Sequence, residues 1–133
     1  MVRYKIGLII NPIAGLGSSV GLHGTDSENI QTALAKGATP QAAFRAEKAL
    51  ISLDNSGDFE FHAHESELGG DLLERLGIQY QPIKVHVNSP SNSADTKNLA
   101  AEFLKLRVDL ILFAGGDGTA RDIFSIVSDQ IPM

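Results

Sequence analysis

The sequence predicts an α/β domain in which an open parallel sheet is flanked by helices. Short apolar runs alternate along the chain with segments whose apolar residues recur at helical spacing. The first run, residues 4–10, is apolar almost throughout, which is typical of a strand covered on both faces. Because strands that alternate with helices of this length are joined by right-handed crossovers, the sheet should be parallel.

The composition is that of one globular domain of ordinary size. The chain has 133 residues, 43% of them hydrophobic and 20% charged, which is enough for a core but too few for a second full domain. The formal charge is −5 and the basic residues do not cluster, so nucleic acid is not an expected partner. Cysteine is absent, which excludes disulfides and agrees with a cytoplasmic location. The apolar run at 6–10 is too short for a membrane span, so no membrane partner is expected.

The first half of the chain predicts two strands with helices between them. The strand over 4–10 ends at Asn11-Pro12. A helix is expected over about 26–36, and a stronger one begins at Pro40, includes Phe44 in its apolar stripe and stops at 55–57. Residues 59–64 alternate between apolar and polar and predict the next strand.

The second half predicts three more helices and two more strands. Asp71 is expected as a first-turn acid on a short helix ended by Gly77. A strand over 83–87 follows, and then a helix capped by Ser93 or Asp95. An apolar run over 108–114 precedes a last helix over 120–128. No metal ligands are assigned, because the two histidines that share a strand face, His62 and His64, lack a third partner at a ligand spacing.

One stretch, Gly-Gly-Asp-Gly-Thr at 115–119, carries the clearest chemistry. Glycine tolerates positive φ and has no side chain, so such a loop lets backbone N–H groups approach a phosphate. A tight strand-to-helix turn would also explain the glycines. It would not explain the acid among them, because a carboxylate repels phosphate unless it coordinates a cation or accepts a proton. The stretch therefore predicts a phosphate-binding turn in which Asp117 is the reactive group and Thr119 lies in the first turn of the next helix.

A second polar element follows the first strand at Asn11-Pro12. An Asn fixed there by the following Pro would project its amide into the crevice where open α/β sheets bind ligands, although a simple turn is the alternative. The glycines at 15–21 do not form a dinucleotide fingerprint, because the third comes one residue late. The Asn11 and Asp117 loops together predict a ligand site where strand C-terminal ends meet.

These elements resemble the paired motifs of a kinase superfamily. Residues 115–119 match the GGDGT signature shared by NAD kinases, diacylglycerol and sphingosine kinases and phosphofructokinases, and 11–15 resemble its NPxSG element with Ala14 in place of Ser. The stretch VGLHGTD at 20–26 and the Ala-Arg-Asp at 120–122 are similar to the ATP-NAD kinase-like branch. That branch includes predicted ATP- or polyphosphate-dependent NAD kinases and acetoin-catabolism accessory proteins, whose members usually have Lys where His23 stands.

The resemblance implies a Rossmann-like sheet that forms the N-terminal domain of a two-domain kinase. Such a kinase transfers a phosphoryl group from ATP or polyphosphate to the adenosine-ribose 2′-hydroxyl of NAD, with Mg²⁺ or another divalent cation. It implies a catalytic role for Asp117. The groups implied to contact nucleotide or phosphate are Asn11, Gly115, Gly116, Gly118 and Thr119, with Arg121 and Asp122 as further candidates.

The domain organisation is also an expectation from this resemblance. Nothing in the chain corresponds to the β-rich second domain of these kinases, so we expect residues 1–133 to be a single nucleotide-binding domain, truncated before it and inactive alone. We expect the full-length protein to be a cytoplasmic homo-oligomer.

Two alternatives stay open. A lipid kinase of the diacylglycerol type would share both loops, but its motif usually continues with a Glu two or three residues after Thr119, where this chain has Arg121-Asp122. A non-catalytic nucleotide-binding or regulatory module would share them as well.

Overall fold

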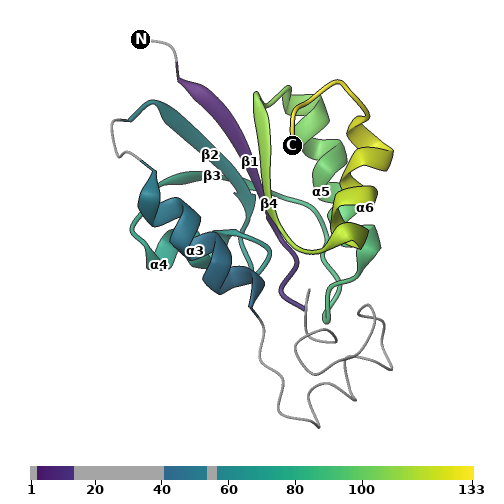
Figure 1. Ribbon diagram of the computed structural model, residues 1–133, viewed down its shortest axis with the longest axis horizontal. Helices are drawn as coiled ribbons and strands as arrows, with labels where there is room; N and C mark the ends of the chain where they lie inside the picture. Colours follow the sequence, from purple (N-terminus) through teal and green to yellow (C-terminus); the bar gives the residue numbers. More distant parts are fainter. Residues whose placement is uncertain (1–2, 14–40, 54–56) are drawn as a thin grey trace, which may run out of the picture.

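Strands and helices alternate in the computed structural model, which describes residues 3–13, 41–53 and 57–133 (Figure 1). The elements in chain order are β1 (Tyr4–Ile10), α3 (Ala42–Ser52), β2 (Phe59–His64), α4 (Gly70–Arg75), β3 (Tyr80–Ile83), α5 (Ser93–Leu106), β4 (Leu110–Ala114) and α6 (Asp117–Val127). The first two strands have the predicted bounds. The helix expected over about 26–36, the glycines at 15–21 and the stretch at 20–26 lie outside the described residues.

The four strands form one parallel sheet in the order β3-β2-β1-β4, which confirms the predicted fold class. The chain steps outward from β1 to β2 and β3 and then returns to place β4 on the other side of β1. This reversal brings the C-terminal ends of β1 and β4 together, with Ile10 beside Ala114. Open α/β sheets bind ligands at such a switch point.

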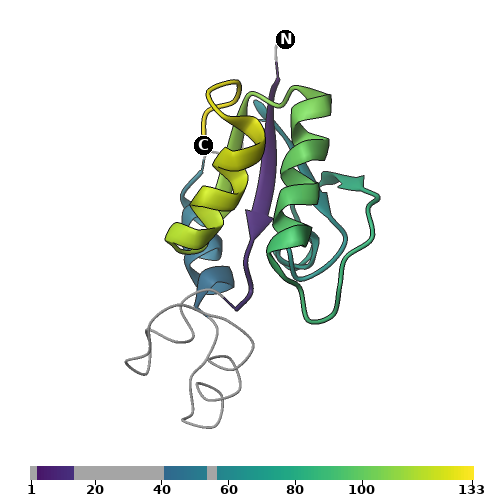
Figure 2. The same cartoon turned by 90° about the vertical axis from the view of Figure 1, so that its right-hand side faces the viewer.

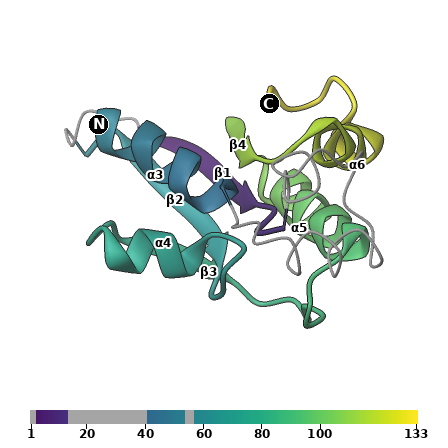
Figure 3. The same cartoon turned by 60° about the horizontal axis from the view of Figure 1, so that its bottom comes forward.

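Two helical layers cover the sheet, α3 and α4 on one face and α5 and α6 on the other (Figure 3). The alternation of side chains along β1 supplies both cores. Ile6, Leu8 and Ile10 pack with α3 and α4, whereas Ile9 packs with α5 and α6. Gly7 leaves room for the Phe103 ring, because a Cβ there would lie 2.7 Å from ring atoms. None of the helices in the described ranges is long and apolar enough to cross a membrane.

The third strand does not lie where the sequence predicted it. Instead of 83–87, it covers Tyr80–Ile83 and includes Pro82. Proline argues against a central strand because it cannot donate a ladder hydrogen bond, but β3 pairs only with β2 and is an edge strand. Whether a strand lies at the edge depends on the whole sheet and cannot be read from the local sequence.

Helix α3 also packs differently from the prediction. Phe44, which was expected in the apolar stripe, is 51% exposed, with Lys48 Nζ 4.6 Å from its ring centroid. The buried residues are Ala42, Ala46 and Leu50, spaced four apart. The helix ends at Ser52, before the predicted stop at 55–57. Small side chains on the buried face let the helix lie close to the sheet.

Candidate functional site

The two polar elements predicted after separate strands meet at the switch point. The Asn11 backbone N–H donates to the Ala114 carbonyl at 2.9 Å, which extends the pairing of β1 and β4 by one residue. The Asn11 Nδ2 donates to Thr119 Oγ1 at 3.1 Å, and its Oδ1 accepts from the Ile13 N–H at 3.2 Å. The residues predicted to form one site are therefore brought together.

Helix α6 starts three residues earlier than predicted, so three of the five residues of the glycine-rich stretch are helical. Gly116 is the N-cap residue and Asp117 the first helical residue. N–H groups in the first turn of a helix have no intrahelical acceptor, and no side chain caps this one. Free N–H groups and the helix dipole together make such an end suitable for phosphate.

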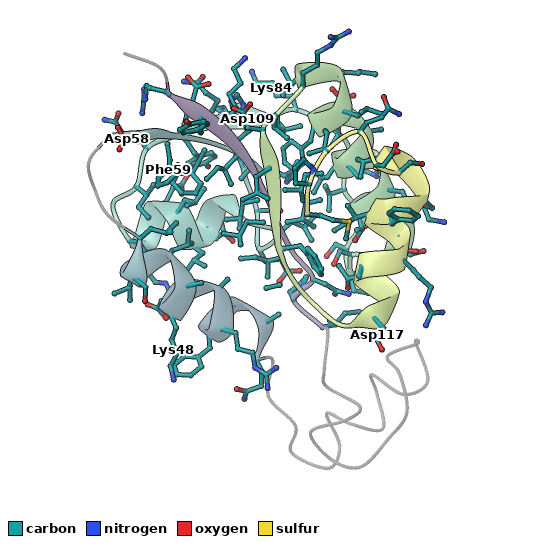
Figure 4. The ribbon with its side chains drawn as sticks, turned by 45° about the horizontal axis from the view of Figure 1, so that its top comes forward. Lys48, Asp58, Phe59, Lys84, Asp109 and Asp117 are labelled. Atoms are coloured by element: carbon teal, nitrogen blue, oxygen red, sulfur yellow. The ribbon has the colours of Figure 1, made fainter. Side chains whose placement is uncertain are left out.

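The Asp117 carboxylate stands free at the start of α6. The side chain is exposed and extends beyond the end of the sheet (Figure 4). No described residue forms a hydrogen bond or ion pair with it. A negatively charged side chain in the first turn of a helix interacts favourably with the helix dipole. Asp117 is therefore available to a cation or to a substrate hydroxyl.

The three glycines of the stretch do not adopt the positive φ that the sequence suggested. Among the described residues, the glycines with positive φ are Gly57 and Gly77. At Gly115 a Cβ would overlap the Thr119 side chain, coming within 2.7 Å of its Cβ, so any larger residue would force the packing here to shift. At Gly116 and Gly118 a Cβ would meet nothing within 4 Å among the described atoms. Neither packing nor backbone conformation requires glycine there, so the bare backbone leaves room for a ligand.

The two further candidates, Arg121 and Asp122, lie one turn along α6. The Asp122 carboxylate is 4.0 Å from Lys97 Nζ of α5 and so links the two helices. Arg121 is exposed and lies four residues from Asp117, on the same side of the helix. Lys97 was not predicted as part of the site, because its partner is on another helix and no short-range pattern marks the pair.

The start of α5 lies near the same edge of the sheet, but its polar groups are engaged. The predicted caps were Ser93 or Asp95, whereas the N-cap residue is Asn92, whose Oδ1 accepts from the Ala94 N–H at 2.9 Å. Asp95 is fully buried and accepts from the backbone N–H of Asn92 at 2.8 Å and of Asn88 at 3.1 Å. It also accepts from Asn88 Nδ2 at 2.9 Å. These contacts explain the segment by capping chemistry.

The described residues at the site offer few ligands for a cation, so substrate phosphates would have to complete its coordination. No group of three His, Cys, Asp or Glu residues suited to a metal occurs in the described part of the chain. His62 contacts Glu60 at 3.0 Å, and His64 contacts Ser66 and the Val85 carbonyl. Mg²⁺ is commonly held by one or two carboxylates together with substrate phosphates. The free carboxylate of Asp117 suits that mode of binding.

The fold and the site define a nucleotide-binding α/β domain of the kinase type. A switch point in a parallel sheet, an uncapped helix start and a glycine-rich turn are features of such a domain. Residues 6–133 match the model of the family described as ATP-NAD kinase N-terminal domain, and the chain belongs to that family. The family-level resemblance is thus confirmed. No curated protein and no solved structure matches the chain.

Proposed function

We propose that this domain forms the phosphate-binding half of the active site of a kinase that converts NAD to NADP, with ATP or polyphosphate as donor. The observation that carries the proposal is the free Asp117 carboxylate at the uncapped start of α6, at the switch point of the sheet. Family membership supports a nucleotide substrate. The β-rich second domain of the full-length protein would supply much of the NAD site.

The chemistry asks the protein mainly to position two anions and to neutralise charge. The backbone N–H groups of Gly118 and Thr119 donate to phosphate oxygens, and the bare Gly116 lets them approach. The adenosine-ribose 2′-hydroxyl gives its proton to Asp117 as its oxygen bonds to phosphorus. The bond from that phosphorus to the donor's bridging oxygen breaks, releasing ADP or a shortened polyphosphate.

A divalent cation suits the same carboxylate. Asp117 is the described group that would hold Mg²⁺, directly or through water. When bound, the cation supplies positive charge to the phosphates, which the acidic chain provides little of itself. Arg121 is placed to add to this charge from the next turn of α6.

We extend the proposal to the branch with ATP- or polyphosphate-dependent NAD kinases and acetoin-catabolism accessory proteins. It is supported by the Ala-Arg-Asp at 120–122 and by the stretch at 20–26. We also propose that the full-length protein is cytoplasmic and forms a homo-oligomer.

The test is an acceptor comparison on the full-length protein. With Mg²⁺ and either donor, it should phosphorylate NAD in preference to diacylglycerol or sphingosine, measured as NADP formed and as labelled lipid. Equal or greater turnover of a lipid would assign the protein to the lipid kinases. Nucleotide binding without turnover of any acceptor would favour a regulatory module.

The domain alone should form no measurable NADP, because without the second domain the acceptor has only part of its site and positioning is lost. Robust NADP formation by residues 1–133 would contradict this division of the site.

A further inference from the structure

The amide of Asn11 is bonded within the protein at both of its heteroatoms. Nδ2 donates to Thr119 Oγ1 at 3.1 Å, and Oδ1 accepts from the Ile13 N–H at 3.2 Å. The second contact spans two residues and fixes the direction of the amide plane. The first spans 108 positions and joins the end of β1 to the start of α6. Bonds within the protein therefore set the orientation of the amide.

The acceptor of this bond is itself immobilised. Thr119 is only 4% exposed. On another side of its side chain lies the Gly115 backbone, so close that no Cβ fits between them. A rigid acceptor lets a single hydrogen bond define geometry, because neither partner can move to accommodate the other. A group buried in this way is also poorly placed to bind phosphate through its hydroxyl.

From this geometry we infer that Asn11 is a positioning residue, which acts through Thr119 on Asp117. Thr119 lies two residues after Asp117 in the same helical turn. The backbone bond from Asn11 to Ala114 aligns the strand ends, but it does not fix the helix that follows β4. The side-chain bond does, and so sets the direction of the first-turn N–H groups and the carboxylate. This inference rests on the proposed kinase function and revises the expected direct contacts of Asn11 and the Thr119 hydroxyl with nucleotide.

The two roles of Asn11 predict different kinetics. If Asn11 bound the nucleotide directly, it would contribute binding energy. Asn11→Ala would then raise KM for that nucleotide, and Thr119 variants would have normal kinetics. A positioning residue contributes alignment, and small misplacements of a reacting group are expensive in rate. Its loss should lower kcat, and removal of its partner should do the same.

The experiment uses Asn11→Ala, Thr119→Val, their combination and Thr119→Ser in the full-length protein. Valine keeps the shape of threonine but has no hydroxyl, whereas serine keeps the hydroxyl. Each of the first two changes should lower kcat by about 10- to 100-fold, with KM for donor and NAD changed less than about threefold. The combination should be no worse than either alone, because both remove one bond. Thr119→Ser should restore most of the loss seen with valine.

Two results would overturn the inference. One is a raised KM in Asn11→Ala with normal kinetics in Thr119→Val. The other is a combination whose losses multiply. If Asn11→Ala does not fold, the valine and serine variants decide the question between them.

A readout without turnover separates this inference from the proposed function. Amide hydrogen exchange at Ala120, whose N–H donates to the Gly116 carbonyl at 3.1 Å, and at the α6 residues after it should accelerate in Asn11→Ala and Thr119→Val but not in Thr119→Ser, because the first turn of α6 loses its anchor. If the wild type makes no NADP, the proposed function fails while this measurement still tests the bond. Unchanged exchange in all variants would show that the bond anchors nothing.

Discussion

Helices α5 and α6 lie side by side on one face of the sheet and both begin near its carboxyl edge, but their first turns differ (Figure 2). The start of α5 is closed by Asn92 and the buried Asp95, which satisfy N–H groups of the turn and the preceding loop. The start of α6 has no side-chain cap. Capping a helix typically adds about 1 kcal/mol of stability. That stability is absent from α6, at the end where a phosphate would bind.

The largest effect is expected at the uncapped start of α6. Asp117→Asn in the full-length protein keeps the size of the side chain but removes its charge, so kcat/KM should fall by about 10²-fold or more. The Tm should barely move, because the carboxylate is exposed and none of the described residues pairs with it. The control is Asp71→Asn, which changes the exposed first-turn acid of α4 and should leave turnover normal. Near-normal turnover in Asp117→Asn, with any loss in stability, would remove the catalytic assignment.

At the capped start of α5, a substitution should lower stability and leave turnover nearly unchanged. Asp95→Ala leaves the N–H groups of Asn88 and Asn92 without their buried acceptor, which should lower the free energy of unfolding by about 2–3 kcal/mol. Urea denaturation measures this loss, and kcat per folded molecule should stay within about twofold. A large loss of activity at unchanged stability would mean that the α5 end belongs to the site as well.

The glycines sharpen the comparison within α6 itself. Gly115→Ala should cost about 1–3 kcal/mol of stability, because the added methyl meets Thr119. Gly118→Ala should leave stability unchanged or raise it by up to about 1 kcal/mol, since its Cβ meets no described atom. It should nevertheless raise KM for the donor about tenfold by occupying ligand space. A normal KM would show that this space is not used.

Tyr80 lies away from the first turns of α5 and α6, so a change there is a control for the comparison between them. Burial and the hydrogen bond to Glu74 raise the pKa of Tyr80 from 10.0 to about 12, with the hydroxyl 2.7 Å from the carboxylate. The folded state thus holds this proton more tightly than the unfolded state. The stability from it is complete below pH 10 and is lost as pH rises toward 12. Thermal melts should show a steeper alkaline loss for wild type than for Tyr80→Phe, and identical slopes would contradict the pKa.

The smallest effect concerns the contact between the two helices. Lys97→Met removes the ion pair with Asp122, which at 4.0 Å between partly exposed groups should contribute less than about 0.5 kcal/mol. Chemical denaturation should therefore give a nearly unchanged midpoint. A loss above about 1 kcal/mol would show that the two helix starts depend on each other.

Sequence patterns correctly predicted those strands whose position depends only on which of their residues are buried. The bounds of β1 and β2 were correct because strands covered on both faces or alternating in polarity show this in their residues. The strand predicted over 83–87 lies instead at Tyr80–Ile83, where Pro82 is tolerated because β3 is an edge strand. Phe44 was assigned to the core, although the sheet accepts alanines there instead.

The site was predicted in part for similar reasons. That the glycine-rich stretch and Asn11 lie together was predicted, because strand ends meet in a parallel sheet. The contact between Asn11 and Thr119 was not, since a hydrogen bond between distant positions has no local pattern. Nor did the sequence separate Gly115, which packs against a neighbour, from Gly116 and Gly118, which face open space.

The 108 positions between Asn11 and Thr119 have a consequence for synthesis on the ribosome. At about 5–20 residues per second, the first strand emerges roughly 5–20 s before the turn that completes the switch point. During that interval β1 can pair with β2, but its other edge has no partner and no nucleotide site exists. Nucleotide added to a translating system should therefore protect only chains that include α6. Protection by ligand, measured on stalled chains of increasing length, would show the chain length at which β4 pairs with β1.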